Sequence, residues 1–313
     1  MSERIPLLID TDPGVDDALA LLMAFSDPHH EVVGLTIAAG NVGLEHTVAN
    51  ALKLCEVAGV AVPVHPGCPV PLVCAAADAA YVHGKDGFGD TGYVPSRRQA
   101  DPETAALAIV RFARQYPGKL LLVTIAPLTN LALALRLDPE LPSRIARLVV
   151  MGGAVNGRGN TSVTAEFNIG FDPEAARIVF EAFPALDLVD WEATLAHGFA
   201  HTAFDAWLAA GDARARFYDG ISKYTRAWSA ERRGERWYAA DALAMAVALE
   251  PDHVESAQTR AVSIDIEGVL TRGAPVADWL QRSDRPAQAR IVLGYRQERF
   301  EALVGRALGA GRG

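Results

Sequence analysis

Short apolar runs alternate with stretches of helical period through most of the chain. Buried strands are expected at 5–9, 32–38, 120–125, 148–151 and 186–189. Helices are expected at 16–25, 44–58, 101–115, 131–137 and 172–183. Repeated strand–helix units of this size predict an α/β fold, with an open, mostly parallel central sheet and helices on both faces.

The pattern is less regular beyond residue 194. Helices are expected at 202–209, 212–228 and 239–249, strands at 259–266 and 289–293, and a helix at the end. Segments 63–101 and 152–170 look like loops, and the first is long enough to predict a lid or binding loop. Because no linker-like composition or internal repeat interrupts the chain, we expect a single domain over residues 1–313.

Polar residues follow several of the expected strands. Asp10 and Asp12 come after the first strand, Asn41 after the second, and 125–130 and 151–168 after later ones. In open parallel sheets the ligand site lies beyond the carboxyl ends of the strands. We therefore expect these segments to line one crevice, which would be the active site.

Composition narrows the class of protein. Half of the 313 residues are hydrophobic and the net charge is −9, which favours a large core and disfavours binding to nucleic acid or anionic membranes. The three cysteines, Cys55, Cys68 and Cys74, contain no Cys-x-x-Cys pair, as is usual in a reducing compartment. No signal-peptide core and no apolar run of roughly 18 to 20 residues is seen. We expect a cytoplasmic protein.

Four aspartates, Asp10, Asp12, Asp16 and Asp17, stand within eight residues behind the first strand. Helix capping and the helix dipole account for about two of them. Buried carboxylates so close together repel one another unless a cation lies among them. Oxygen ligands of this kind suit calcium or magnesium, so we expect a metal site.

Two other classes of protein carry a similar acidic motif. An EF-hand would need Glu at the twelfth position from Asp10, where this chain has Leu21, so that interpretation fails. Aspartate-nucleophile phosphatases also place D-x-D after a buried strand. They need a lysine and a later acidic pair, whereas the later loops here carry Thr-Asn, Gly-Gly and Glu-Phe-Asn.

The acidic segment 10–17 resembles the D-x-D-P-G-x-D-D signature of the nucleoside hydrolases, often labelled inosine–uridine preferring. Further segments resemble family motifs in the same order, namely 39–41, 83–89, 126–132, 151–153, 160–169 and Asp241. The resemblance spans about residues 5 to 250. It implies the nucleoside hydrolase fold and an enzyme that cleaves the N-glycosidic bond of ribonucleosides with water, releasing ribose and a free base.

The resemblance also implies the roles of individual residues. One Ca²⁺ would be held by Asp12, Asp17, Asp241 and the backbone carbonyl of Ile125, with Asp12 also acting as general base. The ribose would be bound through its 2′- and 3′-hydroxyls by Asp16, Asn41 and Asn168, and through its 5′-hydroxyl by Asn160 and Glu166. Asp10 would support this shell by hydrogen bonding. Each role has a simpler alternative. Asp12 is either the base or only a metal ligand or helix cap, and Asn160, Glu166 and Asn168 either bind ribose or form ordinary hydrogen bonds within a loop. Met151 either lines the ribose pocket or packs in the core.

One position departs from the family pattern. Broad-specificity members carry His, and purine-specific members Trp, immediately before the last metal-binding Asp, but this chain has Ala240. Activation of the leaving base would then fall to His83, or to aromatic stacking by Tyr224, Trp228, Trp237 and Tyr238. We expect a preference for purine nucleosides; a broad-specificity or pyrimidine enzyme, or a calcium-dependent binding protein without turnover, remains the alternative. The family resemblance further implies a homodimer or homotetramer.

Overall fold

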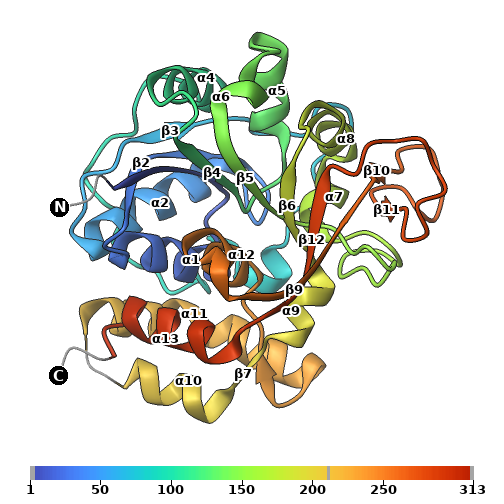
Figure 1. Cartoon of the computed structure of the whole chain (residues 1–313). Coiled ribbons are helices and arrows are strands. Elements are labelled where there is room, and N and C mark those ends of the chain that lie inside the picture. Colours follow the sequence, from blue (N-terminus) through green and yellow to red (C-terminus); the bar gives the residue numbers. More distant parts are fainter. Residues whose placement is uncertain (1–3, 210–211, 311–313) are drawn as a thin grey trace.

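The computed structural model describes residues 4–209 and 212–310, and its centre is a twisted, mostly parallel sheet (Figure 1). The order of its strands is β3-β2-β1-β4-β5-β6-β12-β9. All neighbouring strands are parallel except the edge pair β12 and β9, which is antiparallel. The bounds of these strands are β1 Ile5–Thr11, β2 His30–Ile37, β3 Val64–Pro66, β4 Leu120–Thr124, β5 Ile145–Met151, β6 Leu186–Val189, β9 Val254–Arg260 and β12 Ala289–Tyr295.

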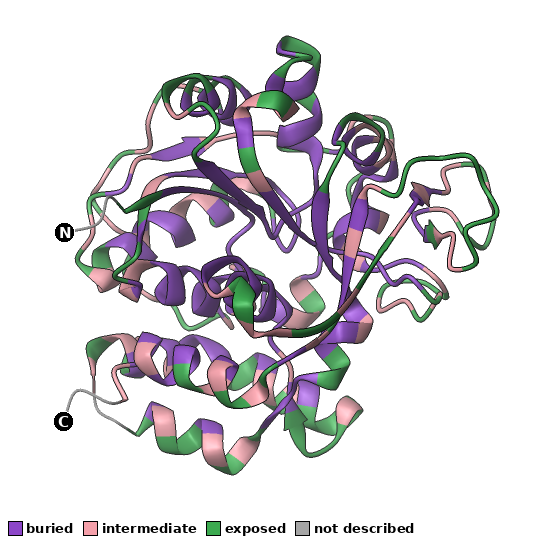
Figure 2. Ribbon diagram, viewed as in Figure 1, coloured by how far each residue is buried: buried purple, intermediate pink, exposed green. Residues whose placement is uncertain are grey.

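Helices cover both faces of the sheet, because successive residues of a strand point to opposite sides. In β1, Leu7 and Ile9 pack with the helices of one face, whereas Leu8 packs with those of the other. The first face carries α1 (Val15–Ser26), α2 (Leu44–Ala58) and α12 (Ala240–Leu249). The second carries α4 (Ala105–Gln115), α5 (Thr129–Leu137), α6 (Leu141–Arg144) and α8 (Pro173–Ala182). Figure 2 shows the sheet buried between them.

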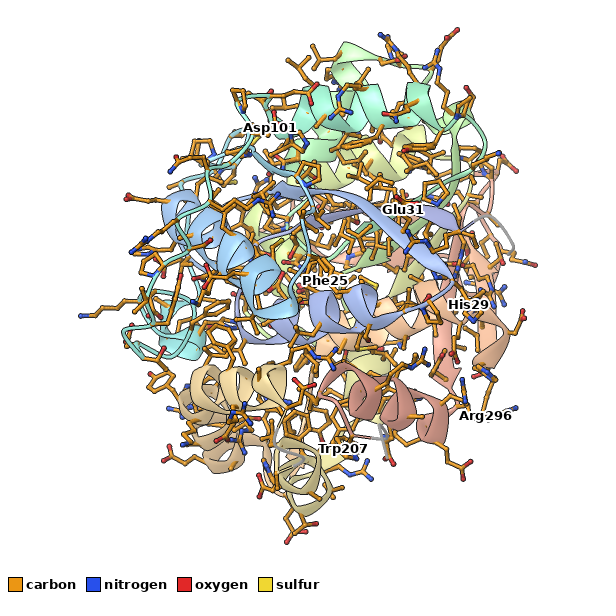
Figure 3. All side chains as sticks on the ribbon, turned by 90° about the vertical axis from the view of Figure 1, so that its left-hand side faces the viewer. Phe25, His29, Glu31, Asp101, Trp207 and Arg296 are labelled. Carbon is orange, nitrogen blue, oxygen red and sulfur yellow. The ribbon has the colours of Figure 1, made fainter. Side chains whose placement is uncertain are left out.

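A further layer of helices lies beyond α1 and α12 (Figure 1). It consists of α10 (His201–Leu208), α11 (Ala213–Arg233) and α13 (Gln297–Ala307). Trp207 of α10 packs edge-on against Phe199, and its indole lies close to Gly305 of α13 (Figure 3). Two short strands, β7 (Phe199–Ala200) and β8 (Arg236–Trp237), join the ends of this layer. The layer carries α11 over the carboxyl end of β1.

The strand order reverses at β1, which places a crevice beside it. The chain runs from β1 to β2 and β3 on one side, and returns to β4 on the other side of β1. Loops that follow neighbouring strands diverge at such a switch point and leave room for a ligand. The loops after β1, β2, β4 and β5 therefore share one edge of the sheet, as the sequence predicts.

The predicted fold class is confirmed, and local differences appear in three segments. The expected strand at 259–266 is divided at Ala261 into β9 and β10 (Val262–Ile264), and β10 pairs with β11 (Pro275–Ala277) in a separate hairpin. β9 has no buried residue, so its apolar pattern is weak. The loop-like stretches contain β3, the short helix α3 (Ala80–His83) and α7 (Phe167–Phe171). Two short helical turns, α9 (Trp191–Ala196) and η1 (Pro251–His253), complete the elements.

Some expectations reach beyond the described residues. The expected single domain includes 1–3, 210–211 and 311–313, which lie outside them. Within 4–209 and 212–310, no helix combines the length and the apolar character needed to span a membrane.

Candidate active site

The acidic loop joins the end of β1 to the start of α1. Asp17 occupies the third position of α1, and its carboxylate accepts hydrogen bonds from the Thr11 hydroxyl at 2.6 Å and from the Gly14 amide at 3.0 Å. The Asn41 side-chain amide donates to the same carboxylate at 2.9 Å. These contacts fix Asp17 at the helix N-terminus, where the dipole favours a negative charge.

Asp12 is fully buried, and only one of its two carboxylate oxygens has a hydrogen-bond partner. Its Oδ2 accepts a hydrogen bond of 2.7 Å from the backbone amide of Asn41, while Oδ1 is buried without a hydrogen-bond partner. Burial raises the pKa of Asp12 well above its usual value, and the charge of Asp17 raises it further. A buried carboxylate oxygen without a donor is costly unless a cation or a proton satisfies it.

Asp241 brings a further carboxylate to the same place from the first turn of α12. One oxygen each of Asp16, Asp17 and Asp241 lie within 4.8 Å of one another. Burial raises the pKa of Asp241 well above its usual value, and the charges of Asp16, Asp17 and Asp12 act in the same direction. The donor set is therefore made of hard carboxylate oxygens that repel one another, which fits a divalent cation such as calcium or magnesium.

Asp10 lies behind this cluster and is held by neighbouring strands. Its Oδ1 accepts hydrogen bonds from the Thr36 hydroxyl at 2.6 Å and from the Asn130 amide at 2.9 Å. Burial raises the pKa of Asp10 to about 7, against the effect of these two bonds. Asn130 also accepts from the Cys68 amide, so Asp10 links β1 to the loops after β3 and β4.

A cavity opens beside the acidic cluster and contains most of the predicted site residues. Those found among its lining residues are Asp16, Asn41, His83, Ile125, Met151, Asn160, Glu166, Asn168, Trp228, Trp237 and Asp241. They come from the loops after β1, β2, β4 and β5, and from α7, α11, β8 and α12. The structure thus gathers residues that are more than 200 positions apart into one pocket.

Another part of the cavity wall is built around α7. Glu166 caps this helix, because its Oε1 accepts from the Asn168 amide at 2.9 Å and its Oε2 from the amides of Gly153 at 2.7 Å and Ile169 at 3.3 Å. Burial raises the pKa of Glu166 to about 7, although the three amides act to lower it. The Asn168 side chain donates to the carbonyl of Ile125 at 3.4 Å, so it lies directly beside the carbonyl expected to bind metal.

Comparison with known proteins agrees with this geometry. The sequence profile described as inosine-uridine preferring nucleoside hydrolase matches residues 7–302. The non-specific ribonucleoside hydrolase RihC of Salmonella enteritidis PT4 is 36% identical over 309 residues, covering 97% of each chain. Uridine nucleosidase 1 of Arabidopsis thaliana is 44% identical over 176 residues, covering 56% of this chain and 52% of that protein. The solved plant nucleoside hydrolase PpNRh1 superposes with a TM-score of 0.92 at 28% identity, covering 98% of this chain and 100% of that one.

The chain belongs to the inosine-uridine preferring nucleoside hydrolase family. It is accordingly an enzyme that hydrolyses ribonucleosides, and the family to which it belongs is metal-dependent in general. The fold predicted from the family resemblance is confirmed by the solved neighbour.

The far end of the nucleoside hydrolase pocket is aromatic. Three of the aromatic residues that the sequence suggests, Trp228, Trp237 and Tyr238, line it together with Tyr81 and Trp191. Tyr224 does not line it. This side chain is 45% exposed and its hydroxyl donates to the carbonyl of Tyr81 at 3.3 Å. Trp191 at the start of α9 was missed by sequence reasoning, because a single aromatic residue after a strand gives no periodic signal.

A short tether holds the α3 segment against α11. The Thr225 hydroxyl donates to the carbonyl of Val82 at 2.8 Å, next to the bond between Tyr224 and Tyr81. Both bonds join one turn of α11 to the segment that carries His83. This part of the pocket wall is thus formed by two elements that contact each other.

His83 lies in this part of the pocket wall in its neutral form. Its Nδ1 accepts a hydrogen bond of 3.1 Å from the amide of Val15, which leaves the ring proton on Nε2. Burial lowers the pKa of His83 to about 4; the charge of Asp17 opposes this shift and that of Arg233 adds to it. At neutral pH the ring can therefore donate one hydrogen bond but carries no additional proton for the leaving base.

A second group of possible metal ligands, His65, Asp101 and Glu103, does not belong to this pocket. The Glu103 carboxylate already forms an ion pair with Arg111 at 2.7 Å. The guanidinium supplies the positive charge there, so this group needs no metal ion.

Proposed function

We propose that the enzyme is a calcium-dependent ribonucleoside hydrolase with a preference for purine nucleosides. The observation that supports a cation most directly is the buried, unpartnered Oδ1 of Asp12 beside Asp17 and Asp241. Calcium suits the site better than magnesium, because it accepts more oxygen ligands in a less regular geometry.

Four groups of this chain would hold the ion: the carboxylates of Asp12, Asp17 and Asp241, and the carbonyl of Ile125. The carboxylate of Asp16, which lies within 4.8 Å of those of Asp17 and Asp241, is assigned to the sugar in this proposal. When bound, calcium would supply the positive charge that holds the vicinal hydroxyls of ribose at the floor of the pocket. Asp10 would keep this floor in place through its bonds to Thr36 and Asn130.

The remaining polar residues would orient the sugar. Asp16, Asn41 and Asn168 are the proposed partners of the 2′- and 3′-hydroxyls, and Asn160 and Glu166 those of the 5′-hydroxyl. All five line the same cavity. Glu166 caps a helix, and backbone amides already orient its carboxylate. Less entropy is therefore lost when this carboxylate binds the 5′-hydroxyl. Met151 lines the cavity beside Asn168, and its position supports contact with the ribose.

Asp12 is the proposed general base. Cleavage of an N-glycosidic bond passes through an oxocarbenium-like sugar, which water attacks from the face opposite the base. The free Oδ1 of Asp12 is an acceptor for a proton of that water. The hydrogen bond from the Asn41 amide holds Oδ2 and therefore the orientation of the carboxylate.

The proposed purine preference depends on the aromatic end of the pocket. Trp228 and Trp237 offer indole surface on which a bicyclic base stacks more extensively than a single ring. A broad-specificity enzyme is the alternative, and the name of the relative RihC refers to activity of that kind. His83 is retained as a proposed partner of the base, as a neutral hydrogen-bond donor.

Three wider expectations remain proposals. We propose that residues 1–313 act as one domain, that the enzyme assembles as a homodimer or homotetramer, and that it works in the cytoplasm without nucleic-acid or membrane partners. The net charge of −9 supports the last point.

A kinetic survey tests the proposed function. The purified enzyme is incubated with inosine, guanosine, adenosine, uridine and cytidine, with calcium or with a chelator, and reducing sugar is measured. We expect ribose release that is fastest with purine nucleosides and that stops in the chelator. Release unaffected by the chelator contradicts the calcium role, and equal rates on all five substrates contradict the purine preference.

A further inference from the structure

Arg233 places a positive charge at the base end of the pocket. It is the last residue of α11 and lines the same cavity as Asp16 and the tryptophans. Its guanidinium carbon lies 4.5 Å from the ring centre of Trp191 and 5.3 Å from that of Trp228. The aromatic rings contact the flat faces of the guanidinium and hold it beside the cavity.

The guanidinium of Arg233 has charged and polar neighbours, namely Asp16, Tyr81 and Tyr238, but no hydrogen-bond partner within the described residues. Across residues 4–209 and 212–310, no side chain or carbonyl forms a hydrogen bond or an ion pair with Arg233. Burial lowers the pKa of Arg233, and the nearby carboxylate of Asp16 acts in the opposite direction. Stacking leaves the N–H groups in the plane of the guanidinium, so they remain available to an acceptor in the cavity.

A further polar atom of the cavity lining also lacks a partner in the described structure. The hydroxyl of Ser229 is buried without a hydrogen-bond partner, whereas the indole N–H of Trp237 interacts with the hydroxyl of Tyr218. Buried donors of this kind are normally satisfied, and in a pocket the ligand is the remaining partner. The base end therefore favours a ligand that is rich in acceptors.

We propose that Arg233 is a specificity-determining residue that binds the O6 and N7 edge of a 6-oxopurine. The preferred substrates are then inosine and guanosine. This inference depends on the proposed function, because it assigns a base to the same pocket. The O6 and N7 atoms of such a base are adjacent acceptors, which an arginine binds with two parallel hydrogen bonds.

The same contact replaces the activation of the leaving base by a side chain at position 240, which is an alanine in this chain. When the C1′–N9 bond breaks, its electron pair passes to N9, and the base departs as an anion with charge spread over N7 and O6. The guanidinium stabilises that charge as it develops. Water forms the new C1′–O bond and gives its proton to Asp12, and the base anion takes a proton from solvent.

Adenine meets the same edge unfavourably. Its C6 amino group is a donor, so it faces the N–H groups of Arg233 with no acceptor at that position. A pocket built to donate hydrogen bonds discriminates strongly against a group that cannot accept them. Arg233 thus separates inosine from adenosine, which have the same ribose and the same ring size.

The test compares Arg233→Met and Arg233→Lys with the wild type on inosine, guanosine, adenosine and uridine. The control variant is Arg232→Met, which removes an exposed charge that stacks on Trp228 at 4.8 Å but does not line the cavity. A p-nitrophenyl riboside serves as a substrate whose leaving group needs no stabilisation. It reports on folding and on the ribose half of the site in every variant.

We expect Arg233→Met to lower kcat/KM for inosine and guanosine by about 10- to 100-fold, and that for adenosine and the aryl riboside by less than about 3-fold. Arg233→Lys should recover part of the loss, since lysine keeps the charge but not the paired geometry. Equal losses on inosine and adenosine, or a comparable loss on uridine, overturn the inference while leaving the proposed function intact. A wild-type enzyme that cleaves no riboside at all rejects both.

Discussion

A β-carbon on Gly40 would lie 2.1 Å from Oδ2 of Asp12, far inside van der Waals contact. Gly40 belongs to the turn after β2, and its neighbour Asn41 donates the amide hydrogen bond that holds the same oxygen. The proposed general base is therefore positioned by a turn that has no room for a side chain at position 40. The sequence predicts that Asn41 binds the ribose hydroxyls, but the close approach of Gly40 to Asp12 appears only in three dimensions.

Gly40→Ala should therefore damage activity. The added methyl group has to displace the Asp12 carboxylate, and a misplacement of about 1 Å can cost about 100-fold in rate. We expect a fall of that order in kcat/KM for inosine, together with weaker calcium binding. Steady-state kinetics and a calcium titration measure the two effects.

Gly43→Ala is the matched control for that variant. It lies three positions further along, at the N-terminus of α2, and a β-carbon there meets nothing within 4 Å. Its backbone angles, φ −60° and ψ 152°, suit alanine. Near-normal activity is expected. A similar loss in both variants would mean that the turn, and not the contact with Asp12, causes the effect.

Calcium should stabilise the folded enzyme. Mutually repelling carboxylates are buried at Asp12, Asp17 and Asp241, and a cation that binds only the folded state relieves this repulsion. At a calcium concentration of about 100 times Kd the gain is about 2.7 kcal/mol. Thermal melts with calcium and with EGTA measure it, and Asp241→Asn should reduce the difference. Melting curves that coincide with and without calcium would refute the site.

Glu166 should contribute to recognition of the 5′-hydroxyl. In Glu166→Gln, one carboxylate oxygen becomes an NH₂ group that faces backbone donors, so both the cap of α7 and the ligand contact suffer. We expect kcat/KM for inosine to fall about 10- to 100-fold, the cost of a hydrogen bond to a charged group. With 5′-deoxyinosine the fall should be smaller. The same fall on both substrates would show that Glu166 acts only as a helix cap.

Stability at low pH should depend on Asp27, at the end of α1. Burial raises the pKa of Asp27, but hydrogen bonds from the His30 ring and the His29 amide, together with the charges of His30 and Arg306, outweigh it, so the pKa lies below the usual 3.8. A carboxylate with a lowered pKa stabilises the folded state above its usual pKa. That contribution is lost as the pH falls through the folded value.

Asp27→Asn should consequently lower the free energy of unfolding at pH 7 by about 1 to 3 kcal/mol. The difference from the wild type should shrink as the pH falls below 3.8. Urea unfolding at several pH values measures this dependence. A difference that stays constant with pH would show that the ionised carboxylate is not the stabilising group.

The sequence indicates the proposed metal and ribose end of the pocket far better than the proposed base end. Asp12, Asn41 and Asn168 follow or lie beyond buried strands, and parallel strands place such residues at one edge of the sheet. This part of the pocket could be predicted because the apolar pattern of β1, β2, β4 and β5 is strong.

The base end has no comparable signal. Arg233 ends a long helix with several other arginines, and nothing in the sequence separates it from the exposed Arg232. Tyr224 and Trp228 share a helix face, yet Tyr224 is held by the α3 segment and does not line the cavity. Which aromatic residues line the cavity depends on how α11 packs against α1 and the α3 segment, and helical spacing does not determine that packing.

The bonds from Thr225 and Tyr224 to the α3 segment have a consequence for turnover. The proposed base site lies beside two elements that are bonded to each other. Either element can move away from the pocket only if the other moves with it or if both bonds break. A movement that widens this end of the pocket is therefore shared by both elements, and steps of this kind limit the turnover of many enzymes.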